Sequence, residues 1–161
     1  MEIANEFLTF ERTSDVEVLS SFSCGVRKID RLIHTKAEYE GLRVCISDPI
    51  YEMFIVFHNE KCVAVFVWHT TVADTDQGPV PAKEIDLVAV DKNLQRQGIG
   101  RKILDSMEEN ARANSYGFLL VGAYYDNRHS AIGFYEKCGF EPNGKKKAHI
   151  LPMIKRLAGE D

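Results

Sequence analysis

The second half of the chain alternates between two hydrophobic periods. Strand patterns rich in branched and aromatic residues occur at EIDLVAV (Glu84–Val90) and YGFLLVGAYY (Tyr116–Tyr125). Between them, apolar residues recur at helical spacing and predict a helix over Arg101–Ala113. A shorter helix is predicted over Asn127–Cys138, ended by a glycine, and a last strand includes His149–Ile154. The apolar stripe of the longer helix consists of Ile99, Ile103, Leu104, Met107 and Ala111.

The first half of the chain predicts a strand, a helical stretch and a hairpin. The strand lies near Phe7–Glu11. MFIVF (Met53–Phe57) and VAVFVWHT (Val63–Thr70) predict two further strands, which the polar turn HNEK joins as a hairpin. ADTDQGPVPA (Ala73–Ala82) is expected to be a loop, because its prolines interrupt a strand. The helical stretch is marked by Val26, Ile29, Ile33 and Ala37.

The order of these elements predicts an α+β fold. Strands and helices alternate, which favours a mixed central sheet of about six to seven strands flanked by helices. We find no stretch with the composition of a linker, so we expect one domain over residues 1–161.

Composition and charge narrow the class of protein. The chain has 161 residues, 45% of them hydrophobic, which is enough for a core without disulfides or metal. The start, MEIANEFLTFER, lacks the apolar segment of a secretory signal, so we expect a cytoplasmic protein with no membrane partner. The net charge of −4 argues against a general nucleic-acid binder. Lys145–Lys147 is a candidate for a local basic patch, but we expect it to form a solvated turn. The four cysteines and five histidines match no zinc spacing, so we expect buried thiols and no metal.

The stretch QRQGIG (Gln95–Gly100) lies in the connection between the predicted strand Glu84–Val90 and the long predicted helix. The first N–H groups of a helix have no internal partner and lie at its positive end, so they suit an anion such as phosphate. Gly98 and Gly100 allow close approach, and Arg96 and Arg101 add positive charge. A plain strand–helix turn is the alternative.

Two common phosphate motifs do not match this corner. A Walker loop requires a Lys and a Ser or Thr after its last glycine, and here Gly100 is followed by Arg101, Lys102 and Ile103. A dinucleotide fingerprint requires a third glycine where Ile103 stands. The pattern is Q-x-x-G-x-G.

That pattern resembles the acyl-CoA loop of the GCN5-related N-acetyltransferase (GNAT) superfamily. IDLVAVDKNLQRQGIGRKIL is similar to the strand–loop–helix signature of the family, and NRHSAIGFYEKCGFEP is similar to its second signature. The two signatures and the elements between them cover Glu84–Pro142, over a third of the chain. The resemblance implies acetyl-CoA as cosubstrate.

The resemblance also implies a set of cofactor-binding residues. The main-chain amides of Gln95–Gly100 would bind the pyrophosphate of coenzyme A, beside Arg101. The main chain of Val88–Val90 would pair with the pantetheine arm, and one amide there would polarise the acetyl carbonyl. Asn127 and Ala131, from the second signature, would contact the cofactor arm. In full, the cofactor-binding set is Val88, Ala89, Val90, Gln95, Arg96, Gln97, Gly98, Ile99, Gly100, Arg101, Asn127, Ala131 and Tyr135.

Three residues are candidates for catalysis. Tyr135 would reach the sulfur of the cofactor and help the thiolate to leave. The alternative role of this residue is that of a core aromatic. Asp86 lies four residues before Val90, where related lysine acetyltransferases place a glutamate base, and Glu84 points the same way. A lysine-like amine has a pKa near ~10.4, so a base or desolvation must supply its neutral form. Alternatively, ordered water serves as the base, or the two carboxylates are ordinary solvated charges with no catalytic role.

The N-terminal part resembles GNAT toxins that acetylate aminoacyl-tRNA. FSCGVRKIDRLI (Phe22–Ile33) carries their F-x-C-G-x-x-x-[IL]-D motif. The chain departs from them in its net acidic charge and in the carboxylates Asp86 and Glu84, which suit a cationic amine better than a nucleic acid. Cys24 in this motif is expected to be buried and structural, not a nucleophile.

Three functional hypotheses result. The first is an N-acetyltransferase that acts on a primary amine of a small molecule or protein by direct attack in a ternary complex. The second is a toxin that acetylates aminoacyl-tRNA and is neutralised by a small partner protein. The third is a non-catalytic acyl-CoA-binding module, against which the intact loop and Tyr135 argue. A homodimer is left open.

Overall fold

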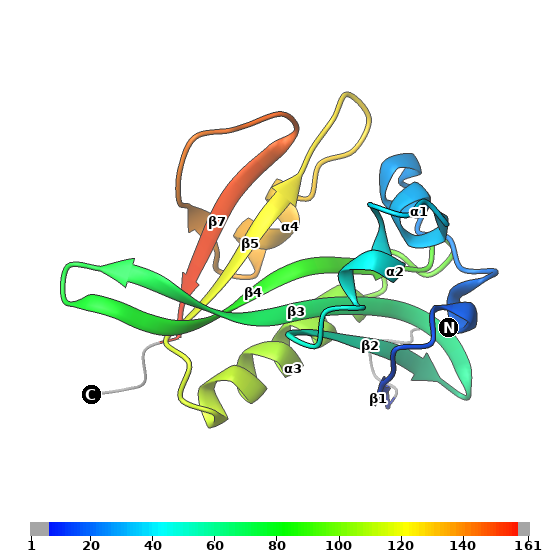
Figure 1. The fold of residues 1–161 in the computed structure, drawn as a ribbon, viewed down its shortest axis with the longest axis horizontal. Coiled ribbons are helices and arrows are strands. Elements are labelled where there is room, and N and C mark those ends of the chain that lie inside the picture. The colour runs from blue at the N-terminus through cyan, green and yellow to red at the C-terminus, as the bar shows by residue number, and fades with distance from the viewer. Residues whose placement is uncertain (1–6, 158–161) are drawn as a thin grey trace. The chain divides into compact units, whose positions relative to one another are not determined.

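A mixed seven-stranded sheet is the framework of the protein in the computed structural model, which describes residues 7–157 (Figure 1). Its strand order is β1-β2-β3-β4-β5-β7-β6, which confirms the expected α+β class and mixed sheet. The strands are β1 (Thr9–Arg12), β2 (Tyr51–His58), β3 (Lys61–Thr75), β4 (Gly78–Val90), β5 (Phe118–Tyr124), β6 (Glu141–Pro142) and β7 (Ile150–Arg156). The helices are η2 (Val16–Leu19, a 3₁₀ helix), α1 (Arg27–His34), α2 (Leu42–Cys45), α3 (Ile99–Ala113) and α4 (Ile132–Lys137).

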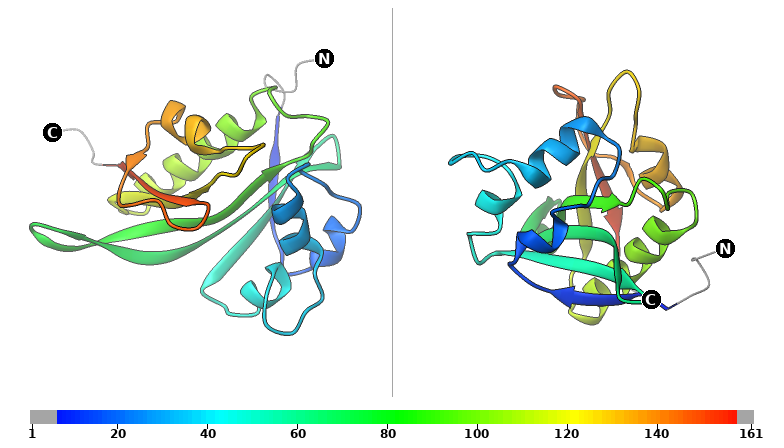
Figure 2. Two further views of the ribbon diagram at one scale, coloured as in Figure 1. Left: turned by 90° about the horizontal axis from the view of Figure 1, so that it is seen from above. Right: turned by 90° about the vertical axis from the view of Figure 1, so that its right-hand side faces the viewer.

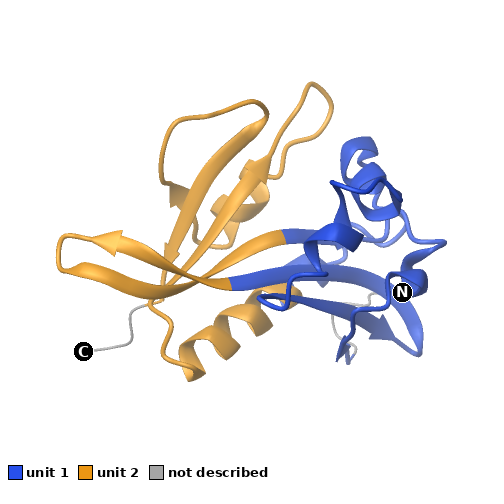
Figure 3. Ribbon diagram, viewed as in Figure 1, with its two compact units in different colours: residues 1–69, 87–102 blue, residues 70–86, 103–161 orange. Residues whose placement is uncertain are grey.

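Contacts within the chain divide it into two compact units (Figure 3). Unit 1 comprises residues 1–69 and 87–102, and unit 2 comprises residues 70–86 and 103–161. Each unit is described by itself below.

Unit 1 is built on the antiparallel strands β1, β2 and β3. The β2–β3 hairpin predicted from HNEK is confirmed, and Asn59 and Glu60 take the left-handed φ values, 51° and 66°, of a tight two-residue turn. The segments η2, α1 and α2 lie beside these strands (Figure 2). They bury Leu19, Phe22, Ile33 and Leu42 against β2 and β3 side chains such as Met53, Ile55, Val65 and Val67.

The N-terminal helix of unit 1 is shorter than its apolar pattern predicts. α1 ends at His34, so Ala37 lies outside it. Thr35 is extended (φ −64°, ψ 143°), and its hydroxyl accepts a hydrogen bond from the Ala37 amide at 3.2 Å. This local bond competes with continuation of the helix.

Unit 2 contains the parallel part of the sheet. β4 pairs with β5 in parallel from Ala82↔Phe118 to Ile85↔Val121, and β5 pairs antiparallel with β7. α3, which joins β4 to β5, buries its predicted stripe almost completely, since Ile103, Leu104, Met107 and Ala111 are 0–3% exposed. In the described part of the chain, no helix is long and apolar enough to cross a membrane.

The segment Ala73–Ala82 is mostly strand, so the expectation of a loop was wrong. β3 continues to Thr75 and β4 begins at Gly78 (φ 102°), which leaves a two-residue turn. The Thr75 hydroxyl donates to the Gly78 carbonyl at 2.7 Å and accepts from the Gln77 amide at 3.1 Å. Proline is tolerated in a strand wherever its missing N–H is not needed by the ladder.

The second short helix also begins later than predicted. α4 covers Ile132–Lys137, whereas the pattern predicted Asn127–Cys138. The Asp126 carboxylate accepts hydrogen bonds from the amides of Arg128 and His129 at 2.8 and 2.7 Å, which holds the preceding residues in a turn. The expected left-handed glycine after the helix is confirmed, with a φ of 96° at Gly139.

Candidate active site

The strand–helix corner in unit 1 has the backbone of an anion site. Arg96 (φ 66°) and Gly98 (φ 85°) take left-handed conformations in the loop that leads into α3. Gln95, Arg96, Gly98 and Arg101 are exposed. Such a loop at the start of a helix suits an anion, and the pyrophosphate-binding role of Gln95–Gly100 stays a prediction.

The side chain of Gln95 hydrogen-bonds to two main-chain oxygens outside the loop. Its Nε2 donates to the main-chain oxygen of Cys24 at 2.6 Å and to that of Val90 at 3.0 Å. The side-chain nitrogen of Gln95 is thereby engaged within the protein. The sequence pattern had assigned a role to the main chain alone.

The C-terminal end of β4 carries the residues expected to pair with the pantetheine arm. The β4–β5 ladder has its last pair at Ile85↔Val121, and Val88–Val90 follow this pair along the strand. Val88 and Val90 are half-buried, and Ala89 is buried. Main chain at the end of a strand can accept an added extended segment by hydrogen bonding.

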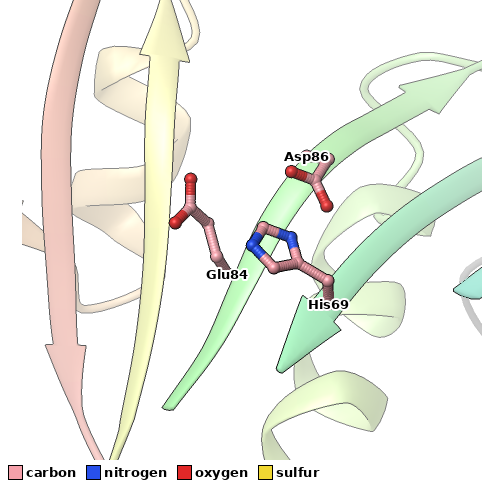
Figure 4. Close-up of side chains that lie close together, drawn as sticks. All are labelled: His69, Glu84 and Asp86. Atoms are coloured by element: carbon pink, nitrogen blue, oxygen red, sulfur yellow. The ribbon is translucent and has the colours of Figure 1, made fainter. Parts of the chain in front are cut away.

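Glu84 and Asp86 lie close together with a third residue, His69 (Figure 4). Each of the three offers a polar atom, and these atoms all lie within 4.8 Å of one another. Glu84 and His69 are half-buried and Asp86 is exposed. Two carboxylates and an imidazole suit proton transfer and the binding of a cation, and the same donors could hold a metal ion.

His69 was not identified from the sequence. It is the second-last residue of the predicted strand Val63–Thr70, and because a loop is predicted soon after it, the predicted elements give no sign that it lies near the two carboxylates. A turn at Asp76–Gln77 before Gly78 would have predicted a hairpin, and a hairpin brings the strand that contains His69 beside the strand that contains Glu84 and Asp86. The His69 ring also packs against Tyr51, with ring centroids 4.8 Å apart.

Tyr135 is a buried residue of α4 in unit 2. Its ring is 6% exposed and makes edge contacts with Phe134 and Phe140, at centroid distances of 5.1 and 5.4 Å. Burial, and secondly the neighbouring Cys138, raise the pKa of Tyr135 well above its usual range. The phenol therefore stays protonated at physiological pH and keeps an O–H that can donate a hydrogen bond. Its role toward the thioether sulfur stays a prediction.

The other two residues of the second signature lie before α4. Asn127 is exposed in the turn that Asp126 organises. Ala131 is half-buried, and its amide donates to the Tyr124 carbonyl at 2.8 Å. Both flank the start of α4 and are not within the helix.

The cysteines are free thiols, as expected. Cys24 and Cys138 are buried, and Cys45 and Cys62 are half-buried. Burial raises the pKa of Cys24 to about 11, so its thiol is protonated and unsuited to nucleophilic attack.

A basic and aromatic surface occurs on two loops of unit 2; we call it the lysine–tyrosine surface and define it by Tyr125, Arg128, Lys145–Lys147 and His149. A main-chain hydrogen bond joins Tyr125 to His149: the Tyr125 amide donates to the His149 carbonyl at 2.9 Å. The Lys146 ammonium lies 4.8 Å from the centre of the Tyr125 ring. The three lysines are exposed, as expected for a solvated turn, and Lys146 lies over an aromatic ring.

Comparison with known proteins identifies the family of this chain. The family model described as "Acetyltransferase (GNAT) domain" matches residues 49–142. A curated relative, the tRNA(Met) cytidine acetyltransferase TmcA of Aeropyrum pernix, is 28% identical over 123 residues, which make up 76% of this chain and 16% of that protein. This chain thus spans about a sixth of the relative's length.

Two solved structures share the fold over nearly the whole chain. One is a tyrosine-to-phenylalanine mutant of the toxin AtaT, bound to the C-terminus of the antitoxin AtaR and acetyl-CoA, with 19% identity, a TM-score of 0.68 and 93% coverage of both chains. The other is AtaT complexed with acetyl-methionyl-tRNAfMet, with 20% identity, a TM-score of 0.65, and coverage of 91% of this chain and 94% of that one. Because the family model matches more than half of the chain, the chain belongs to the GNAT acetyltransferase family.

Proposed function

We propose that the acceptor is a primary amine, of a small molecule or protein, which attacks acetyl-CoA directly in a ternary complex. The observation that carries this proposal is the cluster of Glu84, Asp86 and His69, whose polar atoms lie within 4.8 Å of one another. Two carboxylates attract an ammonium group and can take its proton, so the cluster suits a cationic substrate.

The donor is held by the corner and the end of β4. The main-chain amides of Gln95–Gly100 bind the pyrophosphate, and Arg96 and Arg101 add charge. The main chain of Val88–Val90 holds the pantetheine arm, and one of its amides polarises the acetyl carbonyl. Asn127 and Ala131 flank the arm. The exposed positions of Arg96 and Gly98 and the left-handed φ of Gly98 support this assignment.

The acetyl group moves in one addition and one elimination. Asp86 or Glu84, directly or through water, removes a proton from the substrate ammonium. The neutral nitrogen attacks the thioester carbon, and a C–N bond forms as the carbonyl oxygen takes negative charge. The C–S bond then breaks, and the nitrogen loses its second proton to the base or solvent.

Tyr135 stabilises the leaving sulfur. The conjugate pKa of the departing thiolate is near ~8.5, and the pKa of Tyr135 is raised by burial, so a hydrogen bond from the phenol is favoured over complete proton transfer. The thiolate takes its final proton from solvent, and charge is balanced without any other reactant.

An amine panel with a thiol-release readout tests the proposal. It contains polyamines, amino acids, lysine peptides and aminoacyl-tRNA, each with acetyl-CoA. We expect turnover with at least one cationic free amine. Turnover with aminoacyl-tRNA alone would contradict the proposal and favour the second candidate.

The second candidate is acetylation of the amino group of aminoacyl-tRNA, and the lysine–tyrosine surface favours it. Exposed lysines, one of which lies over a tyrosine ring, suit a nucleic-acid backbone and its bases, even though the net charge of the chain is −4. The complex of AtaT with acetyl-methionyl-tRNAfMet, a structure of similar fold, adds support. Under this candidate, a small antitoxin protein is the expected second partner.

Expression in a growing cell separates the two candidates. The second candidate requires growth arrest that is lost when Lys145, Lys146 and Lys147 are changed together to Gln. Matched substitution of Lys28, Lys36 and Lys61, which are exposed in unit 1, should leave the arrest in place. Healthy growth on expression of the unaltered chain would contradict it.

A further inference from the structure

We propose that Asp30 and Gln95 are positioning residues, which hold the donor loop Gln95–Gly100 in the conformation that binds the pyrophosphate. They act through the main chain of Ser23–Gly25. The inference rests on the proposed donor site and names what sets its shape. All of these residues belong to unit 1.

Asp30 organises the turn at Ser23–Gly25. Its Oδ1 accepts from the Cys24 amide at 2.8 Å, and its Oδ2 accepts from the Ser23 hydroxyl at 2.7 Å and the Gly25 amide at 3.3 Å. Burial acts to raise the pKa of Asp30, but these hydrogen bonds outweigh it and the pKa is lowered. The carboxylate is thus charged and committed to the turn.

The turn presents two carbonyls to the segment that leads into the donor loop. The Ser23 oxygen accepts from the Lys92 amide at 2.8 Å, and the Cys24 oxygen accepts from Gln95 Nε2 at 2.6 Å. Gly25 has a φ of +83°, and a Cβ added there would lie 3.2 Å from the Cβ of Lys92. The turn and the segment are therefore closely packed, with little room to shift.

Gln95 joins this turn to the end of β4. Its side-chain nitrogen has two N–H donors, and it donates to the carbonyls of both Cys24 and Val90. The next residues include Arg96 and Gly98, both at positive φ. A non-glycine residue in this region is strained, so the loop depends on its surroundings to keep its conformation.

This network gives the N-terminal motif FSCGVRKID a structural role. Cys24 is 3% exposed, and the Phe22 carbonyl lies 2.6 Å from His34 Nε2. The motif residues pack and hold a turn, and the turn braces the donor loop. The motif acts on acetyl-CoA only through the loop.

Two ligands test the inference by isothermal titration calorimetry. Acetyl-CoA carries the pyrophosphate, and S-acetylpantetheine lacks it. Gln95→Ala and Gln95→Glu remove the two donated hydrogen bonds, and Asp30→Ala frees the turn. We expect each variant to bind acetyl-CoA about tenfold more weakly, as for loss of roughly one net hydrogen bond, while affinity for S-acetylpantetheine changes less than about twofold. The Asp30→Ala/Gln95→Ala pair should lose no more than the larger single loss.

Asp15→Ala is the matched control. Asp15 caps η2 in the same unit, where its Oδ1 accepts from the Glu17 amide at 3.0 Å, and it should lose stability without loss of acetyl-CoA affinity. If Asp30→Ala does not fold, the Gln95 variants, at an exposed position, decide alone. Unchanged acetyl-CoA affinity in these variants, or an equal loss for both ligands, overturns the inference. Failure of the unaltered protein to prefer acetyl-CoA over S-acetylpantetheine would instead overturn the donor site itself, and the inference with it.

Discussion

The side-chain nitrogen of Gln95 lies 2.6 Å from the main-chain oxygen of Cys24, although the two residues are 71 positions apart in the sequence. This contact ties the first residue of the donor loop to a turn that Asp30 holds. It means that the shape of the loop depends on the N-terminal part of the chain, which contributes no predicted ligand-binding group.

The charge of Asp30 should make the stability of the protein depend on pH. The folded-state pKa is lowered from 3.8, so the carboxylate stabilises the fold above the unfolded-state pKa, and this stabilisation is lost as pH falls through the folded pKa. At pH 7, Asp30→Asn should cost about 1–2 kcal/mol of unfolding free energy. Urea titrations at pH 7 and pH 3 should show a smaller difference between the two proteins at pH 3. An equal difference at both pH values would argue against a charged Asp30.

Gly98→Ala should weaken acetyl-CoA binding. Gly98 has a φ of 85°, where a side chain costs roughly 1 kcal/mol or more, and the loop must shift to relieve it. We expect calorimetry to show at least a roughly fivefold loss of affinity. Gly78→Ala, at a φ of 102° in the β3–β4 turn with open space around it, carries the same backbone strain and should lose stability only. Equal acetyl-CoA affinity of the two variants would contradict a role for the corner.

Tyr135→Phe should slow acetyl transfer without weakening the binding of acetyl-CoA. The ring contacts with Phe134 and Phe140 survive, whereas the donor to the leaving sulfur is lost. We expect kcat to fall about 100-fold, as for the loss of one acid catalyst. Tyr116→Phe, which removes a hydroxyl that lies 3.0 Å from the Thr70 hydroxyl, is the control and should keep its activity. Full activity of Tyr135→Phe would leave Tyr135 as a packing residue.

Asp86→Asn should change the pH–rate profile of the enzyme. If Asp86 is the base, kcat/KM loses its acidic limb and falls about 100-fold near pH 7. Glu84→Gln, measured in parallel, identifies the base if Asp86→Asn has only a small effect. Unchanged profiles for both variants would show that ordered water or desolvation supplies the neutral amine.

Glu108 should contribute to acid sensitivity through a separate network in unit 2. Burial raises the pKa of Glu108, but contacts with Lys155 and Arg112 outweigh it and lower the pKa. The ion pair between Arg112 and Glu108 has an N–O distance of 2.7 Å. Lys155 also donates a hydrogen bond to the Cys138 carbonyl at 2.7 Å. The stabilisation is present above the unfolded-state pKa and is lost as pH falls through the folded one, so the melting-temperature advantage of the unaltered protein over Glu108→Gln should shrink from pH 6 to pH 3. Glu109→Gln, at the exposed neighbour, should melt like the unaltered protein at both pH values.

Local patterns predicted the elements that bury a continuous apolar face. The prediction of the buried stripe of α3 is confirmed, because the spacing of its apolar residues alone decides which side chains face the core. Ile99, at the first helical position, is 1% exposed. The prediction of a loop over Ala73–Ala82 was wrong, because proline disfavours a strand only at positions where the strand pairing needs an N–H donor. The pairing of the strands determines which positions these are. The late start of α4 depends on hydrogen bonds to Asp126, which a helical pattern does not reveal.

By itself, the sequence determined the strand–helix corner with its two glycines, the buried α3 stripe and the position of Tyr135 before the glycine that ends α4. These features follow from local backbone preferences and from spacing along one element. Only the tertiary structure decided that His69 lies with Glu84 and Asp86, and that Gln95 reaches Cys24. Such contacts join residues far apart in the chain, and their existence depends on strand register and on how a turn packs against a loop, which no local pattern specifies.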